Sequence, residues 1–230
     1  MNRVLKVARM QLINKQTYVW VPLMVIGAAF VISWLIFAIL RVPSGAPAFN
    51  GAAQAPLWYF AVIGVQSLTL TFPFSQALSV TRRTFFLGTT LVALGSGAIV
   101  ATLYILLAPL ELATNGWGVH STMFNIVWVT EGPWYHAWVF FLALTMVFFQ
   151  FGFWAATLYK RWGATVLTAV LIGLGLVLVG LLALVSWQNW WSHLGSWFVA
   201  QSPLSVGGWM LGLAAVLAAT AYLVLRRTTP

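Results

Sequence analysis

Residues 19–40 read VWVPLMVIGAAFVISWLIFAIL, an apolar run with no charged side chain. A helix rises about 1.5 Å per residue and the hydrocarbon core of a bilayer is about 30 Å thick, so about 20 apolar residues cross it. The run is longer than the apolar core of a signal peptide, about 7–15 residues. In addition, the small-residue segment that follows the run, at 45–48, contains Pro47 and is therefore a poor site for signal-peptide cleavage. The run therefore predicts a membrane-spanning helix that is retained.

Five further runs of the same kind follow, at 57–78, 86–108, 137–158, 164–186 and 207–225. None of them contains a charged side chain. This favours helices over the strands of a membrane barrel, in which polar and apolar residues alternate. Little chain remains outside the six runs, so we expect one all-α integral membrane domain over residues 1–230.

The basic residues predict the orientation of the chain. Ten of the eleven Lys and Arg fall on the side that holds both termini: Arg3, Lys6, Arg9, Lys15, Arg82, Arg83, Lys160, Arg161, Arg226 and Arg227. Arg41 and the two acids, Glu111 and Glu131, fall on the other side. Basic residues accumulate in cytoplasmic segments. We therefore expect cytoplasmic termini and a multi-pass protein of a bacterial-type plasma membrane. The net charge of +9 is then a topology signal, and nucleic acid is not an expected partner.

The composition excludes most catalytic chemistry. The chain has two acids, no Cys and no G-x-x-x-x-G-K-[ST] phosphate loop. Its three His fall outside the spans at spacings that form no metal motif, so no metal site is expected. We expect no enzyme activity and no cofactor in this chain. A membrane protein without a nucleotide site of its own suggests a separate subunit that supplies the energy.

Two cytoplasmic segments are candidates for contact with a partner. In residues 2–17, the basic residues Arg3, Lys6 and Arg9 recur every third position among apolar ones, which predicts an amphipathic helix on the inner leaflet. It serves either as an anchor on anionic lipid or as a docking element. The second segment is the loop of Ser79, Val80, Thr81, Arg82, Arg83, Thr84 and Phe85. Its two guanidinium groups suit carboxylate pairing.

Polar and small residues inside the spans suggest a path and packing sites. Gln66, Thr69 and Gln76 fall on one face of an ideal helix, which predicts that this face points into the bundle, a subunit interface or a substrate path. Gly173 and Gly180 in the fifth span, and Gly208 and Gly212 in the sixth, predict close helix approach, within the chain or with a second copy.

The pattern resembles the membrane subunit of type-2 ABC exporters. The string LSVTRRTFFLG at 78–88 is similar to the G-x-[ST]-R-x-x-F-x-x-G stretch of small Gram-positive permeases, with Ala77-Leu78 where a Gly is common. The elbow at 2–17, the six spans and an outer amphipathic segment at 190–198 are also similar to this family. One departure is the long outer loop at 109–136, where the family has a tight one.

The resemblance implies a role and partners. Loop 79–85 would couple the chain to a cytoplasmic ATPase subunit that holds ATP and Mg. A second permease copy, identical or not, would complete the path, with Gln66, Thr69 and Gln76 near it and Gly173 and Gly180 opposite. Two other functions stay open: a non-transporting scaffold or sensor that recruits a cytoplasmic protein, and an ATP-independent channel or facilitator.

Overall fold

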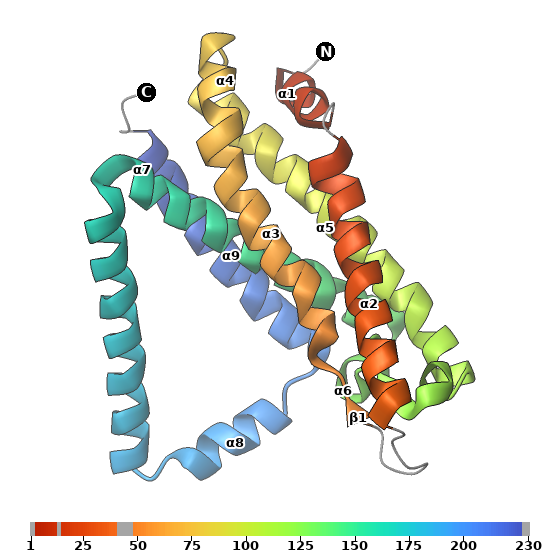
Figure 1. Ribbon diagram of the computed structural model, residues 1–230. Coiled ribbons are helices and arrows are strands. Elements are labelled where there is room, and N and C mark those ends of the chain that lie inside the picture. The colour runs from red at the N-terminus through yellow and green to blue at the C-terminus, as the bar shows by residue number, and fades with distance from the viewer. Residues whose placement is uncertain (1–2, 13–14, 41–47, 227–230) are drawn as a thin grey trace.

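The computed structural model describes residues 3–12, 15–40 and 48–226, and these fold as an all-α protein, as expected (Figure 1). Arg41, Arg227 and residues 2, 13 and 14 of the expected elbow lie outside the described residues. In chain order the elements are α1 (Arg3–Leu12), η1 (Gln16–Trp20), α2 (Val21–Leu40), β1 (Ala48–Phe49), η2 (Gly51–Gln54), α3 (Ala55–Gln66), η3 (Ser67–Thr71), α4 (Phe72–Ala77), α5 (Arg82–Ala113), η4 (Gly116–His120), β2 (Ser121–Thr122), α6 (Val127–Thr130), α7 (Trp134–Trp187), α8 (Trp191–Val199) and α9 (Pro203–Leu225).

Five helical stretches in the described part of the chain are long and apolar enough to cross a membrane: Gln16–Leu40, Gly51–Ala77, Arg82–Ala113, Trp134–Trp187 and Pro203–Leu225. They support a multi-pass membrane protein. The stretch Trp134–Trp187 contains both the fourth and the fifth expected spans. The six-span count therefore depends on whether both parts of α7 cross.

Gly163 divides α7 into a first limb (134–162) and a second limb (164–187). Its φ of 81° and ψ of −179° are not helical, and this region of backbone space is one that glycine enters at little steric cost. The chain turns sharply at this point (Figure 1). Each limb is longer than the about 20 residues that a membrane crossing needs.

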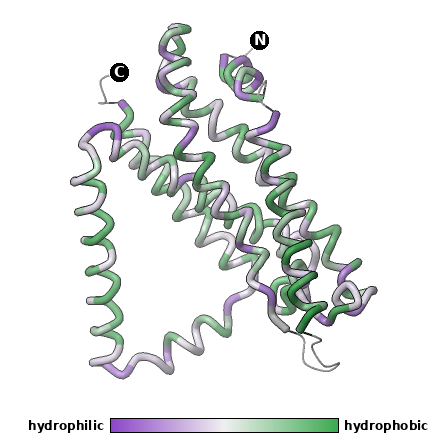
Figure 2. Tube along the Cα trace, viewed as in Figure 1, coloured by the Kyte–Doolittle hydropathy of each residue, from purple (hydrophilic) through white to green (hydrophobic). Residues whose placement is uncertain are grey.

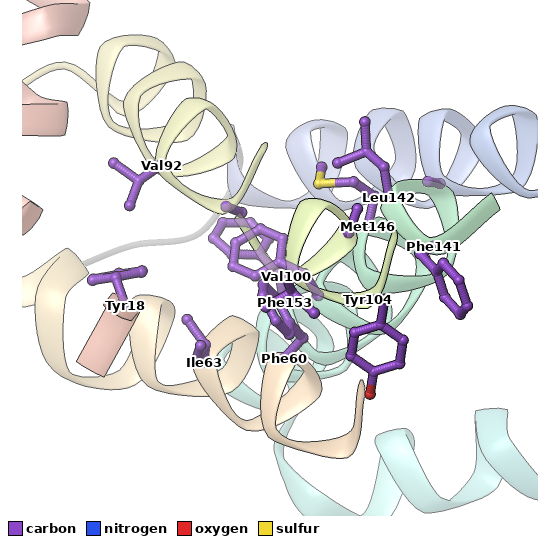
Figure 3. Packing of buried hydrophobic residues seen from close by; sticks show 14 of the residues in the cluster. Tyr18, Phe60, Ile63, Val92, Val100, Tyr104, Phe141, Leu142, Met146 and Phe153 are labelled. Atoms are coloured by element: carbon purple, nitrogen blue, oxygen red, sulfur yellow. The ribbon is translucent and has the colours of Figure 1, made fainter. Parts of the chain in front are cut away.

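The first limb of α7 is the centre of the bundle, with α3, α5 and α9 packed around it. Buried aromatic residues fill the space between these helices (Figure 3), among them Phe60, Tyr104 and Phe153. The backbones of α3 and α7 approach each other closely. A Cβ added to Gly152 would lie 2.0 Å from the carbonyl oxygen of Ala61, and one added to Gly64 would lie 2.2 Å from that of Phe149. The two backbones thus touch where both helices carry glycine.

The second limb and α8 stand apart from this bundle (Figure 1). None of residues 159–202 is buried. Figure 2 shows mostly apolar residues along the second limb and hydrophilic ones at the bend above it. An apolar helix without burial in its own chain is typical of a segment that contacts lipid or another membrane protein.

The elements that carry most of the basic residues gather at one end of the molecule. Figure 1 shows α1, the α4–α5 junction, the bend of α7 and the end of α9 at this end, with α6, α8 and the β1–β2 pair at the other. This is the arrangement that the charge pattern predicts for the connecting segments. Their assignment to the cytoplasm stays a prediction.

Candidate functional site

The helix expected within residues 2–17 is present as α1, and it is seated on α5. Val7, Ala8 and Gln11 form its buried face. Gly88 allows the close approach, because a Cβ at that position would lie 2.8 Å from Cγ1 of Val7. Gln11 Nε2 donates to Oγ1 of Thr89 at 2.5 Å. α1 is therefore held by specific protein contacts in addition to any contact with lipid.

The junction of α4 and α5 is a tight turn over residues 78–81. The N–H of Ser79 donates to the carbonyl of Gln76 at 2.9 Å, and Gln76 Nε2 donates to the carbonyl of Val80 at 3.1 Å. Thr81 caps α5, since its Oγ1 accepts from the N–H of Thr84 at 3.3 Å. The expected coupling loop thus consists of this turn and the first turn of α5, with no separate helix between them.

α1 and this turn face each other across a groove of about 370 Å³, here called the basic groove. Its lining residues are Arg3, Lys6, Val7, Met10, Ser79, Val80, Thr81 and Thr84. One wall supplies cations and the other supplies hydroxyls. The two segments that the sequence analysis singled out separately therefore form one surface. Its chemistry suits a carboxylate or phosphate, which accepts charge-assisted hydrogen bonds.

The two adjacent arginines have different surroundings, which corrects the expectation that both are available to a partner. Nη1 of Arg82 donates to the carbonyl oxygens of Leu225 at 3.0 Å and Arg226 at 2.9 Å. It thereby satisfies carbonyls at the C-terminal end of α9, where a cation is also favoured by the helix dipole. Arg83 is exposed.

Phe85 also belongs to the interior. It is fully buried, and its ring centroid lies 5.2 Å from that of Phe72. Of the residues expected to contact a partner, Ser79, Thr81 and Arg83 are exposed and Val80 and Thr84 are half-buried. Arg82 and Phe85 instead make contacts within the chain: Arg82 with the end of α9, and Phe85 with Phe72.

The expected polar face of the second span is distorted by a π turn. Gln66 ends α3, Thr69 lies in η3 and Gln76 lies in α4. Because η3 has π geometry with i→i+5 hydrogen bonds, the angles of an ideal α-helix do not carry across it. Thr69 is exposed, and its Oγ1 donates to the carbonyl of Val65 at 3.0 Å. Gln66 and Gln76 are half-buried. A substrate path along these three side chains stays a prediction.

Among the described residues of this span, the buried polar ones are two serines that the sequence pattern does not indicate. Ser67 and Ser75 are fully buried. The hydroxyl of Ser67 lies 3.1 Å from that of Tyr18, so the two π-helical segments η1 and η3 meet there. No hydropathy pattern distinguishes these serines from the others in the chain.

The four glycines expected to pack helices do not do so within this chain. A Cβ at Gly173, Gly180, Gly208 or Gly212 would meet no atom within 4 Å. Among the described helices, the glycines that pack closely are Gly64, Gly88, Gly97, Gly152 and Gly207. Contact of Gly173, Gly180, Gly208 and Gly212 with a second copy stays a prediction.

At the opposite end, a buried carboxylate organises the long loop that follows α5. Glu111 is 1% exposed, and it accepts from the backbone N–H of Met123 at 2.7 Å, Phe124 at 2.8 Å and Asn125 at 2.6 Å. The indole of Trp117 donates to the same carboxylate at 3.1 Å. These donors fold the loop back onto the end of α5. The family resemblance did not foresee this structure.

Further polar contacts attach this loop to the neighbouring helices. Asn50 donates to the hydroxyls of Ser33 and Ser121, and the indole of Trp34 donates to the carbonyl of Trp117 at 3.1 Å. The sequence signal for this structure was a lone acid at the edge of an apolar span.

Within the described ranges, no three His, Asp or Glu side chains gather in a way that could hold a metal ion.

Compared with known proteins, the chain matches no family model, no curated protein and no solved structure. The basic groove and the arrangement of the helices are therefore the features that indicate a function.

Proposed function

We propose that this chain is the membrane subunit of an ATP-binding-cassette exporter of type 2. It crosses a bacterial-type plasma membrane six times with both termini in the cytoplasm. It pairs with a second permease copy, identical or not, and it couples to a separate ATPase that binds ATP and Mg. The observation that carries the proposal is the basic groove, in which the elbow and the coupling segment face each other.

Charge supports an acidic protein segment as the occupant of the basic groove. Arg3 and Lys6 line one wall, and Arg83 is exposed on the first turn of α5 beside the other. The two acids of the chain lie away from the groove: Glu111 is near the C-terminal end of α5, and Glu131 follows α6, at the other end of the molecule. A carboxylate from an ATPase subunit would complement these cations.

The contacts that link the groove walls to the membrane helices support coupling between an ATPase and these helices. Its walls belong to α1, which is seated on α5, and to the turn that Gln76 ties to α4. Arg82, directly after the turn, holds the end of α9. A push on the groove from the cytoplasm would therefore reach several membrane helices at once.

A charge-reversal series tests the assignment. Lys6→Glu and Arg83→Glu should abolish recovery of the ATPase with the tagged chain from native membranes in mild detergent, while the chain still inserts. Arg161→Glu is the matched control, because Arg161 carries the same charge but lies at the bend of α7, on neither α1 nor the first turn of α5.

The outcomes separate the candidate functions. Recovery of a phosphate-loop ATPase that is lost in Lys6→Glu and Arg83→Glu supports the proposal. Undiminished recovery in those variants contradicts the groove as the coupling site. Recovery of a signalling protein in place of an ATPase identifies the scaffold function, and substrate flux without ATP in vesicles of the purified chain identifies the channel.

A further inference from the structure

The flank of α1 that faces away from the basic groove has a different character. Leu5, Arg9 and Leu12 follow one another at helical spacing and are all exposed. The basic flank carries Arg3 and Lys6 with hydroxyls opposite, whereas this flank combines two leucines with one cation. The two sides of α1 therefore suit different ligands.

A second groove of about 300 Å³, here called the apolar groove, runs beneath this flank. Leu5 and Leu12 of α1, Val19 of η1, and Leu91 and Ile99 of α5 contribute apolar side chains to it. Gly95 forms part of its floor, and a Cβ there would meet no atom within 4 Å. The groove is open along α5 from Leu91 to Ile99, which spans about 12 Å at the rise of an α-helix.

The position of the single charge in this lining is informative. Arg9 is the charged residue among the lining side chains, and it stands on α1 at the end of the molecule where the basic segments gather. The apolar side chains of α5 lead from it toward the middle of the bundle. A cation at one end of an apolar channel matches an amphipathic molecule with an anionic head and a hydrocarbon tail.

We propose that the apolar groove binds one acyl chain of an anionic phospholipid, with the lipid phosphate beside Arg9. A soluble protein segment fits less well, because Leu91 and Ile99 are 43% and 47% exposed and continue the apolar outer surface of α5. The bound lipid would stabilise the seat of α1 on α5 from the side opposite the basic groove. This inference does not depend on the proposed function, since it concerns the other flank of α1 and needs no ATPase.

Photolabelling of the purified chain in vesicles tests the proposal. The vesicles contain phosphatidylcholine with a minor fraction of phosphatidylglycerol that carries a photoreactive group on its acyl chain, and labelled peptides are identified by mass spectrometry. Residues 91–99 should be labelled more strongly than residues 171–180 of the second limb of α7, which report ordinary lipid contact. The same probe on phosphatidylcholine should show no such preference.

Two variants with matched controls identify the groove. Gly95→Leu fills the floor and should remove the excess labelling of 91–99, whereas Gly173→Leu, also in open surroundings, should not. Arg9→Gln should lower it about fivefold, the affinity that one basic residue contributes near an anionic surface. Lys6→Gln changes the net charge equally but lines the basic groove, so it should have little effect.

Equal labelling of 91–99 by the two lipid probes would overturn the proposal. So would unchanged labelling in Gly95→Leu, or an equal loss in Arg9→Gln and Lys6→Gln, which would indicate general attraction to anionic lipid. The variants can be compared only as monodisperse protein, and Arg9→Gln changes an exposed side chain, so it tests the site even where Gly95→Leu fails to fold.

Discussion

Single glycines decide how closely the central helices approach. Lipid tails are as apolar as leucine, so helices in a bilayer gain from tight van der Waals packing more than from burial itself. Gly64 and Gly152 let the backbones of α3 and α7 touch, because any Cβ would lie within 2.2 Å of a carbonyl oxygen across the contact. The glycines expected to pack, by contrast, face open space.

Gly152→Ala should therefore be strongly destabilising. Its added methyl would collide with backbone, which cannot move aside as a flexible side chain can, and overpacking of this kind costs about 1–3 kcal/mol or more. Thermal unfolding in detergent, followed by near-ultraviolet circular dichroism, measures the effect. Gly212→Ala is the control, and it should be neutral or slightly stabilising because a helical Ala is favoured over Gly. Equal melting temperatures for the two variants would contradict the contact.

The two acids of the chain offer a second comparison at the same scale. Glu111→Gln replaces one carboxylate oxygen with an amide NH2 group, which cannot accept a hydrogen bond. Either the N–H of Met123 or the N–H groups of Phe124 and Asn125 therefore lose their acceptor, because the first bonds to Oε1 and the other two to Oε2. A buried donor left without its acceptor costs about 1–3 kcal/mol. Hydrogen exchange of the loop over 116–126 should accelerate. Glu131 is exposed, so Glu131→Gln should leave the exchange unchanged, and an equal acceleration in both variants would disprove the anchoring role.

At the scale of elements, Arg82 at the start of α5 is hydrogen-bonded to the end of α9. Arg82→Gln loses the charge-assisted hydrogen bonds to Leu225 and Arg226, and the last turn of α9 should fray. The cost is about 1 kcal/mol, because Arg82 is only half-buried and solvent weakens the interaction. Amide exchange in the last turn of α9 reports the fraying. Arg83→Gln, one residue away and exposed, should not change it; an identical response would show that the arginine contacts are not the cause.

Hydropathy predicts the membrane helices well and their internal irregularities poorly. The apolar runs at 19–40 and 207–225 match Val21–Leu40 and Pro203–Leu225 to within a few residues. The π turn at Ser67–Thr71 has no such signal, because inserting one residue into a turn leaves the composition unchanged. The engagement of Arg82 also escaped prediction, since nothing local links it to Leu225, which is distant in the chain.

At the scale of the whole molecule, the charge pattern predicts which connecting segments share an end, but it does not predict which helices pack together. A span reads the same in sequence whether it faces lipid or protein, since both surroundings are apolar. The second limb of α7 is an example: its composition resembles that of the first limb, yet none of its residues is buried. The same ambiguity explains why the packing glycines could not be told from the open ones.

The route of this limb through the membrane decides the topology of the chain. The protein has no Cys, so single-cysteine variants can be labelled in intact cells with a membrane-impermeant maleimide. Trp162→Cys and Gln188→Cys mark the two ends of the second limb, and both positions are exposed. With six spans, Gln188→Cys is labelled from outside together with Glu131→Cys, whereas Trp162→Cys and Arg83→Cys react only after permeabilisation. Protection of Gln188→Cys would mean that the limb does not cross. The end of α9 would then lie outside with its basic residues, against the distribution expected for cytoplasmic segments, and the cytoplasmic position of both termini would fall with it.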